Sequence, residues 1–297
     1  MNIVIFGSGA IGSLFGALLS NNNNVALFGR KSHIDIINKE GLEINGKTFF
    51  HKKIPAFCNI KEIKMDIDLL ILSVKSYDTD ISLNLIKNII DSETTLLTIQ
   101  NGLDNIDKIR KKFNHKQIIG GVTTQGSIFV KPGLISHTGF GETILGELDG
   151  TISDRLKKIV KMFNNSGIIT KYSNDINKEI WIKTIINSSI NPLTTIFKCK
   201  NEYLLKNPIL SNIVKFVCNE SVRIANAEGF DFNYDDILNK TKKVINNTCD
   251  NYSSMLQSYE KYKKTEIKSI NGKLIEIGKK QNTDTILNEL LVSLIES

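Results

Sequence analysis

The chain has 297 residues, of which 41% are hydrophobic and 23% are charged, which excludes a disordered protein. This length leaves room for two domains, with one large domain as the alternative. Its net charge of +7 comes from lysines spread along the whole sequence, so we expect no nucleic-acid partner. The longest apolar run, residues 69–74, is too short to cross a bilayer, so we expect no membrane partner. No basic segment precedes the first apolar run, so we expect no secretory signal.

The first part of the chain alternates short apolar runs with helical patterns. We predict strands at residues 2–6, 25–28, 69–74 and 95–99. Apolar residues at i, i+3, i+4, i+7 and i+8 from Ile11 predict a helix after the first strand, and a second helical pattern lies near residues 81–90. This alternation is typical of a doubly wound parallel sheet, so the fold class is α/β of the Rossmann type.

The sequence pattern changes twice further along the chain. Residues 118–148 contain short β-like runs divided by glycines, and after Ser173 glycine becomes scarce and long helical patterns continue to Ile295. We therefore predict an NADP-binding Rossmann domain at residues 1–172 and an all-helical substrate domain at residues 173–297.

A glycine-rich motif, GSGAIG, lies between the first strand and the first helix. Gly7 would permit a tight turn, Gly9 the close approach of a pyrophosphate, and Gly12 close packing of the helix on the strand. Ser8, Ala10 and Ile11 complete the loop, and the start of the helix offers N–H groups to the anion. The alternative is a merely flexible strand–helix turn.

The end of the second strand distinguishes two cofactors. NAD-binding chains carry Asp or Glu there to hold the ribose 2′-hydroxyl, whereas this chain has Arg30 and Lys31, and its first acid is Asp35. A guanidinium matches a 2′-phosphate, so we predict NADPH bound by Arg30. Lys31 stays open between a phosphate contact and an ordinary exposed cation.

Two further strands end in polar residues, Lys75 and Asn101. In open parallel sheets, ligands bind beyond the carboxyl ends of the strands. Position alone does not separate a ligand contact from a turn or cap at either residue.

The segment IWIKTIINSSINPLTTIF (180–197) places Lys183, Asn187 and Asn191 four residues apart, on one face of a helix that we expect to end at Pro192. An ion pair between Glu179 and Lys183 explains the lysine but not the two amides, which are poor helix formers flanked by isoleucines. Amides in an apolar setting need partners, and a polar ligand would supply them.

Cysteine and histidine spacing argues against disulfides and metals. Four scattered cysteines without C-x-x-C spacing predict reduced thiols and a cytoplasmic protein. The four histidines form no pair with ligand spacing, so we predict no metal.

Five segments occur in an order and spacing that resemble the ketopantoate reductase family (2-dehydropantoate 2-reductases), over nearly the whole chain. They are GSGAIG (7–12), VKSYD (74–78), QNG (100–102), IWIKTIINSSINPLTTIFKCKNEYL (180–204) and NYSSMLQSYEKYKKTEIKSING (251–272). The last two segments are much more specific than the glycine motif.

The resemblance implies NADPH-dependent reduction of 2-dehydropantoate to pantoate, a step toward pantothenate and coenzyme A. Lys183 matches the catalytic lysine and general acid, and Asn101 lies beside the nicotinamide and the reacting carbonyl. Glu266 is implied to accept a hydrogen bond from the 4-hydroxyl of the substrate. The positions that match the substrate pocket are Lys183, Asn187, Asn191, Asn201, Asn251, Ser254 and Glu266.

The sequence departs from the family pattern at Ser188, Ser258 and Lys268, none of them a matched catalytic position. Two alternatives stay open: a reductase of another branched 2-oxo acid, and a redox sensor that binds NADPH without turnover. The expected partner is a small 2-oxo acid, and a homodimer remains open because the sequence does not determine the oligomeric state.

Overall fold

The computed structural model describes residues 1–297 and separates into two compact units. Unit 1 comprises residues 1–100 and 105–179, and unit 2 comprises residues 101–104 and 180–297. The second division falls inside a continuous helix, α6 (Ile176–Ile196), and therefore later than the change in composition near residue 172. The units are described separately below.

Unit 1 is built on an eight-stranded sheet in the order β12-β11-β8-β7-β6-β1-β2-β5. Its strands are β1 (Asn2–Phe6), β2 (Asn24–Phe28), β5 (Ala56–Phe57), β6 (Leu69–Leu72), β7 (Thr95–Thr98), β8 (Ile118–Thr123), β11 (Thr143–Glu147) and β12 (Thr170–Tyr172). All neighbouring pairs are parallel except β11 with β8. The predicted Rossmann-type sheet is confirmed, because each predicted strand lies in it.

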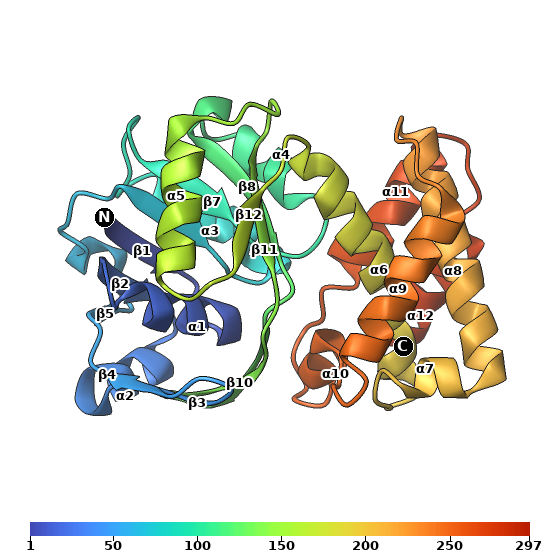
Figure 1. The fold of residues 1–297 in the computed structure, drawn as a ribbon, viewed down its shortest axis with the longest axis horizontal. Coiled ribbons are helices and arrows are strands. Elements are labelled where there is room, and N and C mark those ends of the chain that lie inside the picture. Colours follow the sequence, from blue (N-terminus) through green and yellow to red (C-terminus); the bar gives the residue numbers. More distant parts are fainter. The chain divides into compact units, whose positions relative to one another are not determined.

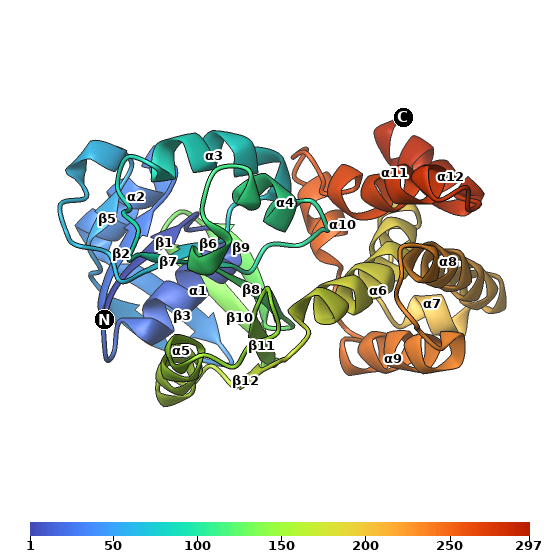
Figure 2. The same cartoon turned by 90° about the horizontal axis from the view of Figure 1, so that it is seen from above.

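Helices cover both faces of this sheet (Figures 1 and 2). Ile3 and Ile5 of β1 pack with α1 (Ala10–Leu19) and α5 (Asp154–Asn165). The alternate residues of β1, Val4 and Phe6, pack with α3 (Thr79–Ile86) and α4 (Asn105–Arg110). Both sets are apolar because each face of a doubly wound sheet is buried, so the strands read as continuous hydrophobic runs.

A second sheet, which the sequence analysis did not predict, lies against α1. It runs β4 (Phe50–Lys52), β3 (Leu42–Gly46), β10 (Leu134–Gly139), β9 (Gly126–Lys131). Helix α1 contacts β3, β9 and β10 on one side and β1 and β2 on the other. Because two sheets enclose the helix, Phe15 and Gly16 are both buried.

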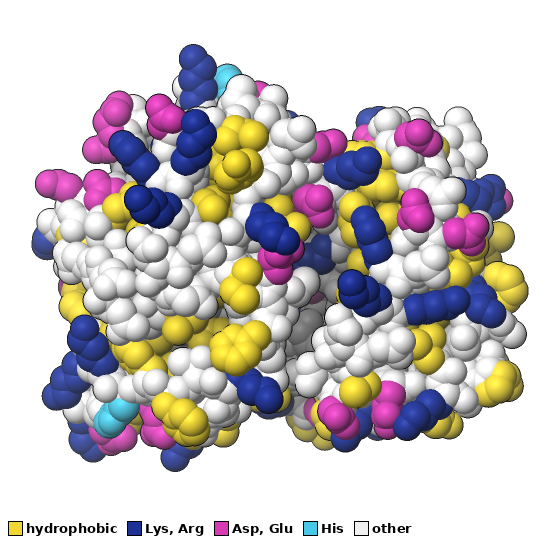
Figure 3. Space-filling view, viewed as in Figure 1, with side chains coloured by type: hydrophobic (Ala, Val, Ile, Leu, Met, Phe, Trp, Pro, Cys, Tyr) yellow, Lys and Arg dark blue, Asp and Glu magenta, His cyan; other side chains and the backbone are white.

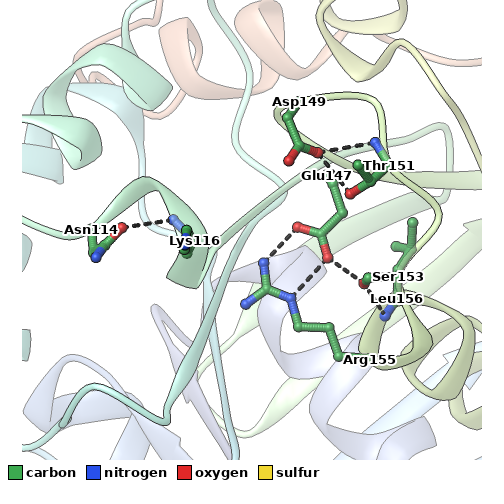
Figure 4. A network of polar contacts seen from close by, with 8 residues as sticks. All are labelled: Asn114, Lys116, Glu147, Asp149, Thr151, Ser153, Arg155 and Leu156. Carbon is green, nitrogen blue, oxygen red and sulfur yellow. Dashed lines mark hydrogen bonds and ion pairs between the residues drawn. The ribbon is translucent and has the colours of Figure 1, made fainter.

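A polar network fixes the start of α5 after β11 (Figure 4). The guanidinium of Arg155 donates to both oxygens of Glu147, a carboxylate that is 6% exposed. Ser153 donates to the same carboxylate and caps α5 by accepting the N–H of Leu156 at 3.1 Å. Asp149 accepts from Thr151 in the intervening turn. The buried carboxylate is thus fully paired, as burial of a charge requires.

Unit 2 is helical, which confirms the predicted all-α second domain. Its helices are α6 with α7 (Tyr203–Lys206), α8 (Pro208–Ala227), α9 (Tyr234–Asn247), α10 (Ser254–Tyr259), α11 (Lys273–Lys280) and α12 (Ile286–Glu296), with a π-helix, η4 (Lys268–Gly272). Its core gathers residues of α6, α8, α9, α11 and α12, among them Trp181, Ile185 and Val217. No helix of either unit combines the length and apolar composition that a membrane span requires, and all four cysteines are free.

Pro192 does not end α6, and the expectation that it would is wrong. The helix continues to Ile196 with Pro192 inside it. A proline lacks the N–H that would bond to the carbonyl four residues earlier, here that of Ser188. In unit 2 the side chain of Asn271 donates to this carbonyl instead, at 3.2 Å. Because a tertiary contact replaces the missing bond, the helix continues past the proline.

Candidate functional site

The glycine motif forms a tight loop between β1 and α1. Gly7 has φ +109° and, together with Ser8, donates its N–H to the carbonyl of Phe28 at the end of β2. The hydroxyl of Ser73, just after β6, donates to the carbonyl of Gly7 at 2.9 Å. The loop is therefore fixed to the ends of two neighbouring strands, and Ser73 is a contributor that the sequence analysis did not identify.

The three glycines meet different surroundings. A Cβ on Gly7 would lie 2.6 Å from the backbone nitrogen of Val74, and one on Gly12 would lie 2.2 Å from the carbonyl oxygen of Gly7. A Cβ on Gly9 would meet no protein atom within 4 Å. Gly7 and Gly12 are thus required by packing, whereas nothing in the protein requires glycine at position 9. Space left open at this position suits the close approach of a pyrophosphate.

The start of α1 presents donors beside that space. The first bond of the helix runs from the N–H of Ser13 to the carbonyl of Gly9, so the N–H groups of Ala10, Ile11 and Gly12 have no partner within the helix. The hydroxyl of Ser8 is buried and has no hydrogen-bond partner. Unpaired N–H groups at a helix start and a buried hydroxyl without a partner fit an anionic group such as a diphosphate.

Arg30 and Lys31 differ in what they contact. Lys31 donates to Asp35 at 3.2 Å within α2 (Lys31–Glu40), with both side chains more than half exposed, which is an ordinary surface pair. Arg30 precedes α2, is exposed, and its guanidinium makes no hydrogen bond or ion pair. Of the two cations, Arg30 is therefore the one that forms no ion pair with a carboxylate.

A buried histidine of α2 connects to the glycine loop. The N–H of Gly133 donates to Nδ1 of His33 at 2.9 Å, so the neutral ring carries its proton on Nε2 and donates to Ser13 Oγ at 3.1 Å. The hydroxyl of Ser13 donates in turn to the carbonyl of Ser8 at 3.1 Å. Burial lowers the pKa of His33 to about 4, so this chain of hydrogen bonds persists at neutral pH.

Gln100 joins the ends of β6 and β7, next to the predicted ligands Lys75 and Asn101. Its amide donates to the carbonyl of Val74 at 2.9 Å and to the hydroxyl of Thr79 at 2.8 Å. Lys75 follows directly on Val74 and is half-buried. Gln100 therefore sets the backbone that carries Lys75, a role that requires the register of both strands and that the sequence did not reveal.

Asn101 and Glu266, 165 residues apart in the sequence, meet in unit 2. The amide of Asn101 donates to Glu266 Oε2 at 3.4 Å, and Glu266 is 6% exposed. The turn that carries Asn101 is held in place by Gly102, whose φ is +98° and whose Cβ position lies 2.6 Å from the carbonyl oxygen of Ser269. That carbonyl also accepts the N–H of Leu103 at 3.2 Å. Only glycine fits this close approach to the π-helix.

Lys183, Asn187 and Asn191 follow one another along one side of α6, as their spacing predicts. Asn191 is 6% exposed, whereas Lys183 and Asn187 are half-buried. Neither asparagine side chain hydrogen-bonds to the protein. The stripe thus presents amide groups that remain available to a polar ligand.

The remaining predicted positions divide into paired and available groups. Asn201 donates to Thr248 at 2.8 Å, while its buried Oδ1 has no partner. Ser253 is buried and caps α10, accepting from Leu256 N–H and from Thr194. Its neighbour Ser254 is exposed. The structure therefore gives the two adjacent serines different roles, with Ser253 structural and Ser254 free to contact a ligand.

Two family profiles match the chain. The family described as Ketopantoate reductase PanE/ApbA matches residues 3–150, and the one described as Ketopantoate reductase PanE/ApbA C terminal matches residues 175–297. The 2-dehydropantoate 2-reductase of Pyrococcus abyssi is 39% identical over 297 residues, covering 100% of this chain and 97% of the relative. That of Archaeoglobus fulgidus is 31% identical over 295 residues, covering 99% and 96%.

Two solved structures resemble this chain in fold over nearly its whole length. A D-mandelate dehydrogenase in complex with NADH and anilino(oxo)acetate has a TM-score of 0.95 and 27% identity, covering 100% of this chain and 97% of that chain. A 2-dehydropantoate 2-reductase from Geobacter metallireducens has a TM-score of 0.91 and 26% identity, covering 100% and 99%. On the two profile matches and the full-length identity, the chain belongs to the ketopantoate reductase family.

Proposed function

We propose that this protein reduces 2-dehydropantoate to (R)-pantoate with NADPH, with Lys183 as general acid. The observation that carries the proposal is the contact of Asn101 with Glu266. Both residues belong to unit 2, where the contact pairs the amide of Asn101 with a buried carboxylate. The motifs that carry the family resemblance include both residues, and full-length identity to 2-dehydropantoate 2-reductases supports the substrate.

The residues that would hold NADPH lie in the glycine loop or follow strands β2, β6 and β7 in the chain. Gly7, Ser8, Gly9, Ala10, Ile11 and Gly12 would hold its diphosphate, Arg30 its 2′-phosphate, and Lys75 and Asn101 its nicotinamide end. The open space at Gly9 and the unpaired hydroxyl of Ser8 support this assignment. When bound, NADPH supplies the hydride that the reaction requires.

Lys183 would complete the reduction at the substrate oxygen. When the 2-oxo carbon gains a hydride, its C=O π electrons move to the oxygen, which becomes an alkoxide. An ammonium group stabilises that negative charge and donates the proton that converts it to a hydroxyl, so it combines electrostatic and general-acid catalysis. The half-buried position of Lys183 on α6 supports this role, because partial burial strengthens its interaction with a developing anion.

Amides and a carboxylate would bind the rest of the substrate. We assign these contacts to Asn187, Asn191, Asn201, Asn251, Ser254 and Glu266. Glu266 would accept a hydrogen bond from the 4-hydroxyl, the group that simple branched 2-oxo acids lack. A buried carboxylate discriminates strongly for such a hydroxyl, because an analogue without it leaves the carboxylate oxygen unpaired.

The experiment that tests the proposal compares 2-dehydropantoate with 2-oxoisovalerate by following NADPH oxidation. The wild type should prefer 2-dehydropantoate in kcat/KM by several orders of magnitude, within the roughly 10⁴–10⁵ that hydroxyl recognition can reach. Glu266→Ala should narrow this ratio while leaving the Kd for NADPH nearly unchanged. Glu276→Ala is the matched control, because the Glu276 side chain is 69% exposed and pairs only with Lys273. Equal rates on both substrates in the wild type would reject the pantoate assignment.

A second candidate function is the reduction of another 2-oxo acid, with the same NADPH ligands and with Lys183 as general acid. The similarity to D-mandelate dehydrogenase supports this second candidate, because mandelate is a 2-hydroxy acid and that structure contains NADH. The same assay separates the two functions when it is extended to aromatic and branched 2-oxo acids and repeated with NADH. A sensor that binds NADPH without turnover would oxidise none of these mixtures.

The compartment and the partners of the protein are also part of the proposal. Four free thiols support a cytoplasmic protein, the compartment that keeps cysteines reduced. Basic and acidic side chains are interspersed on the face drawn in Figure 3, which gives no support to a nucleic-acid surface there. We keep the homodimer as a proposal that sedimentation of the purified protein tests.

A further inference from the structure

The carbonyl of Ser188 lies at the point where α6 would otherwise be weakest. Pro192 cannot donate to it, so the regular helical bond is missing in the middle of the stripe that carries the proposed substrate ligands. Asn187 precedes this carbonyl, and Asn191 lies one turn beyond it. Whatever satisfies the carbonyl therefore fixes the spacing of the two amides.

Asn271 satisfies it from the π-helix η4. Its Nδ2 donates to the Ser188 carbonyl at 3.2 Å and to Asn288 Oδ1 at 2.9 Å, while its own Oδ1 has no partner. The side chain is 0% exposed, so these bonds do not compete with water. An amide that uses both of its donors and neither acceptor position acts here as a double donor.

The same π-helix follows two residues after Glu266, the residue that we assign to the substrate hydroxyl. The carbonyl of Glu266 accepts the N–H groups of Ser269 and Ile270, both at 3.1 Å. The wider turn is closed by the bond from Gly272 N–H to the carbonyl of Ile267 at 3.0 Å, five residues earlier. Short π-helical segments recur at functional sites. One short segment therefore carries both Glu266 and the donor that holds α6.

The far end of the network is anchored separately. Asn288 donates to Glu220 Oε1 at 2.7 Å, and Glu220 also accepts the N–H groups of Leu287 and Asn288 at the start of α12. None of these three bonds involves α6, and Asn288 reaches that helix only indirectly, through a 3.5 Å bond to Ser221 Oγ, which pairs with Ser188 Oγ. Asn288 is as fully buried as Asn271, so it offers a control with the same burial in the same network.

We infer that Asn271 is a positioning residue for the substrate pocket: it sets the register between the amide stripe of α6 and Glu266 by replacing the hydrogen bond that Pro192 removes. This inference rests on the proposed function for its kinetic readout. The geometry also predicts an effect on α6 that can be measured without any substrate. Restoring an N–H at position 192 should compensate for loss of the Asn271 side chain.

The test is a double-mutant cycle with Asn271→Ala and Pro192→Ala. Asn271→Ala should raise the KM for 2-dehydropantoate about tenfold, the effect expected for one buried carbonyl left unpaired, with the Kd for NADPH within about twofold of the wild type. Adding Pro192→Ala, which supplies the N–H, should return the KM to within about threefold of the wild type. Asn288→Ala should lower the melting temperature but leave the KM unchanged, and Pro192→Ala should not rescue it.

Hydrogen exchange measured by mass spectrometry provides the readout that needs no substrate. Peptides covering residues 183–196 should exchange faster in Asn271→Ala, but not in Asn288→Ala, and should recover protection in the double variant. If Asn271→Ala does not fold, Asn271→Ser replaces it in the same comparison. An unchanged KM and unchanged exchange, equal effects of the two asparagine variants, or absence of rescue would each overturn the inference. A wild type that is inactive on 2-dehydropantoate rejects the proposed function instead, and the exchange data still decide whether Asn271 holds α6.

Discussion

Replacing Gly9 by alanine should separate cofactor binding from folding. The new methyl group would meet no protein atom within 4 Å, and the φ of −76° at this position suits alanine. The free energy of unfolding should therefore change by less than about 1 kcal/mol. If the methyl occupies the space that the diphosphate needs, loss of one charge-assisted hydrogen bond costs about 1.5–3 kcal/mol, which raises the Kd for NADPH roughly ten- to hundredfold.

The assay pairs urea unfolding with fluorescence titration of NADPH, and Gly12→Ala is the matched control. A Cβ on Gly12 would lie 2.2 Å from the carbonyl oxygen of Gly7, so this variant should lose stability by at least about 1–3 kcal/mol. Gly9→Ala that binds NADPH as the wild type does would refute the assignment of the loop to the diphosphate. Gly9→Ala that unfolds more easily than Gly12→Ala would refute the packing argument.

Three further outcomes are expected. Arg30→Ala should raise the Kd for NADPH about tenfold or more and leave the Kd for NADH nearly unchanged, because only NADPH carries the 2′-phosphate. Lys31→Ala should change neither Kd, and equal losses of affinity for both cofactors in Arg30→Ala would contradict the assignment of Arg30 to the 2′-phosphate. Lys183→Ala should lower kcat about 10²–10⁴-fold with NADPH binding unchanged, and a variant that keeps most of its kcat would leave only the surface-pair interpretation. Burial lowers the pKa of His33 from 6.5 to about 4, so the unfolded chain binds this proton first as the pH falls, and stability should decline between these pH values by at most about 1.4 kcal/mol per pH unit from this group. His33→Asn should flatten that part of the curve in urea unfolding, and identical slopes would show that His33 does not titrate there.

Local patterns were sufficient to predict the main sheet and the amide stripe. The strands at residues 2–6 and 95–99 are mostly apolar, and buried at nearly every position, because both faces of the sheet are covered, and this signal is independent of their partners. Lys183 and Asn187 required only helical periodicity. The further residues of the substrate pocket came from the family resemblance, because nothing in the local sequence of Asn201 or Ser254 separates a ligand contact from a cap.

Features that depend on distant partners were not predicted. The second sheet pairs β3 with β10, strands that lie far apart in the chain, and β4 has only three residues. Pro192 is a helix breaker by local rules, and only the position of Asn271 explains why the helix continues. Gln100 and Ser73 act through backbone carbonyls on neighbouring strands. Their roles follow from strand register, which the sequence alone does not supply.

The enclosure of α1 between two sheets has a consequence for the order of folding. Helix α1 and the glycine loop lie near the N-terminus. The hydrogen bonds that hold the loop run through Ser13 and His33 to Gly133, which lies 100 positions after His33 in the chain. During synthesis, which proceeds from the N-terminus, the outer side of α1 therefore stays exposed until the β9–β10 hairpin has been made. Pairing over such a separation is slow, because the entropy of closing a long loop is lost before the contact forms. Secondary structure in unit 1 should thus appear before the capacity to bind NADPH, and the second sheet, although it supplies none of the proposed ligands, would set the rate at which the nascent chain becomes competent.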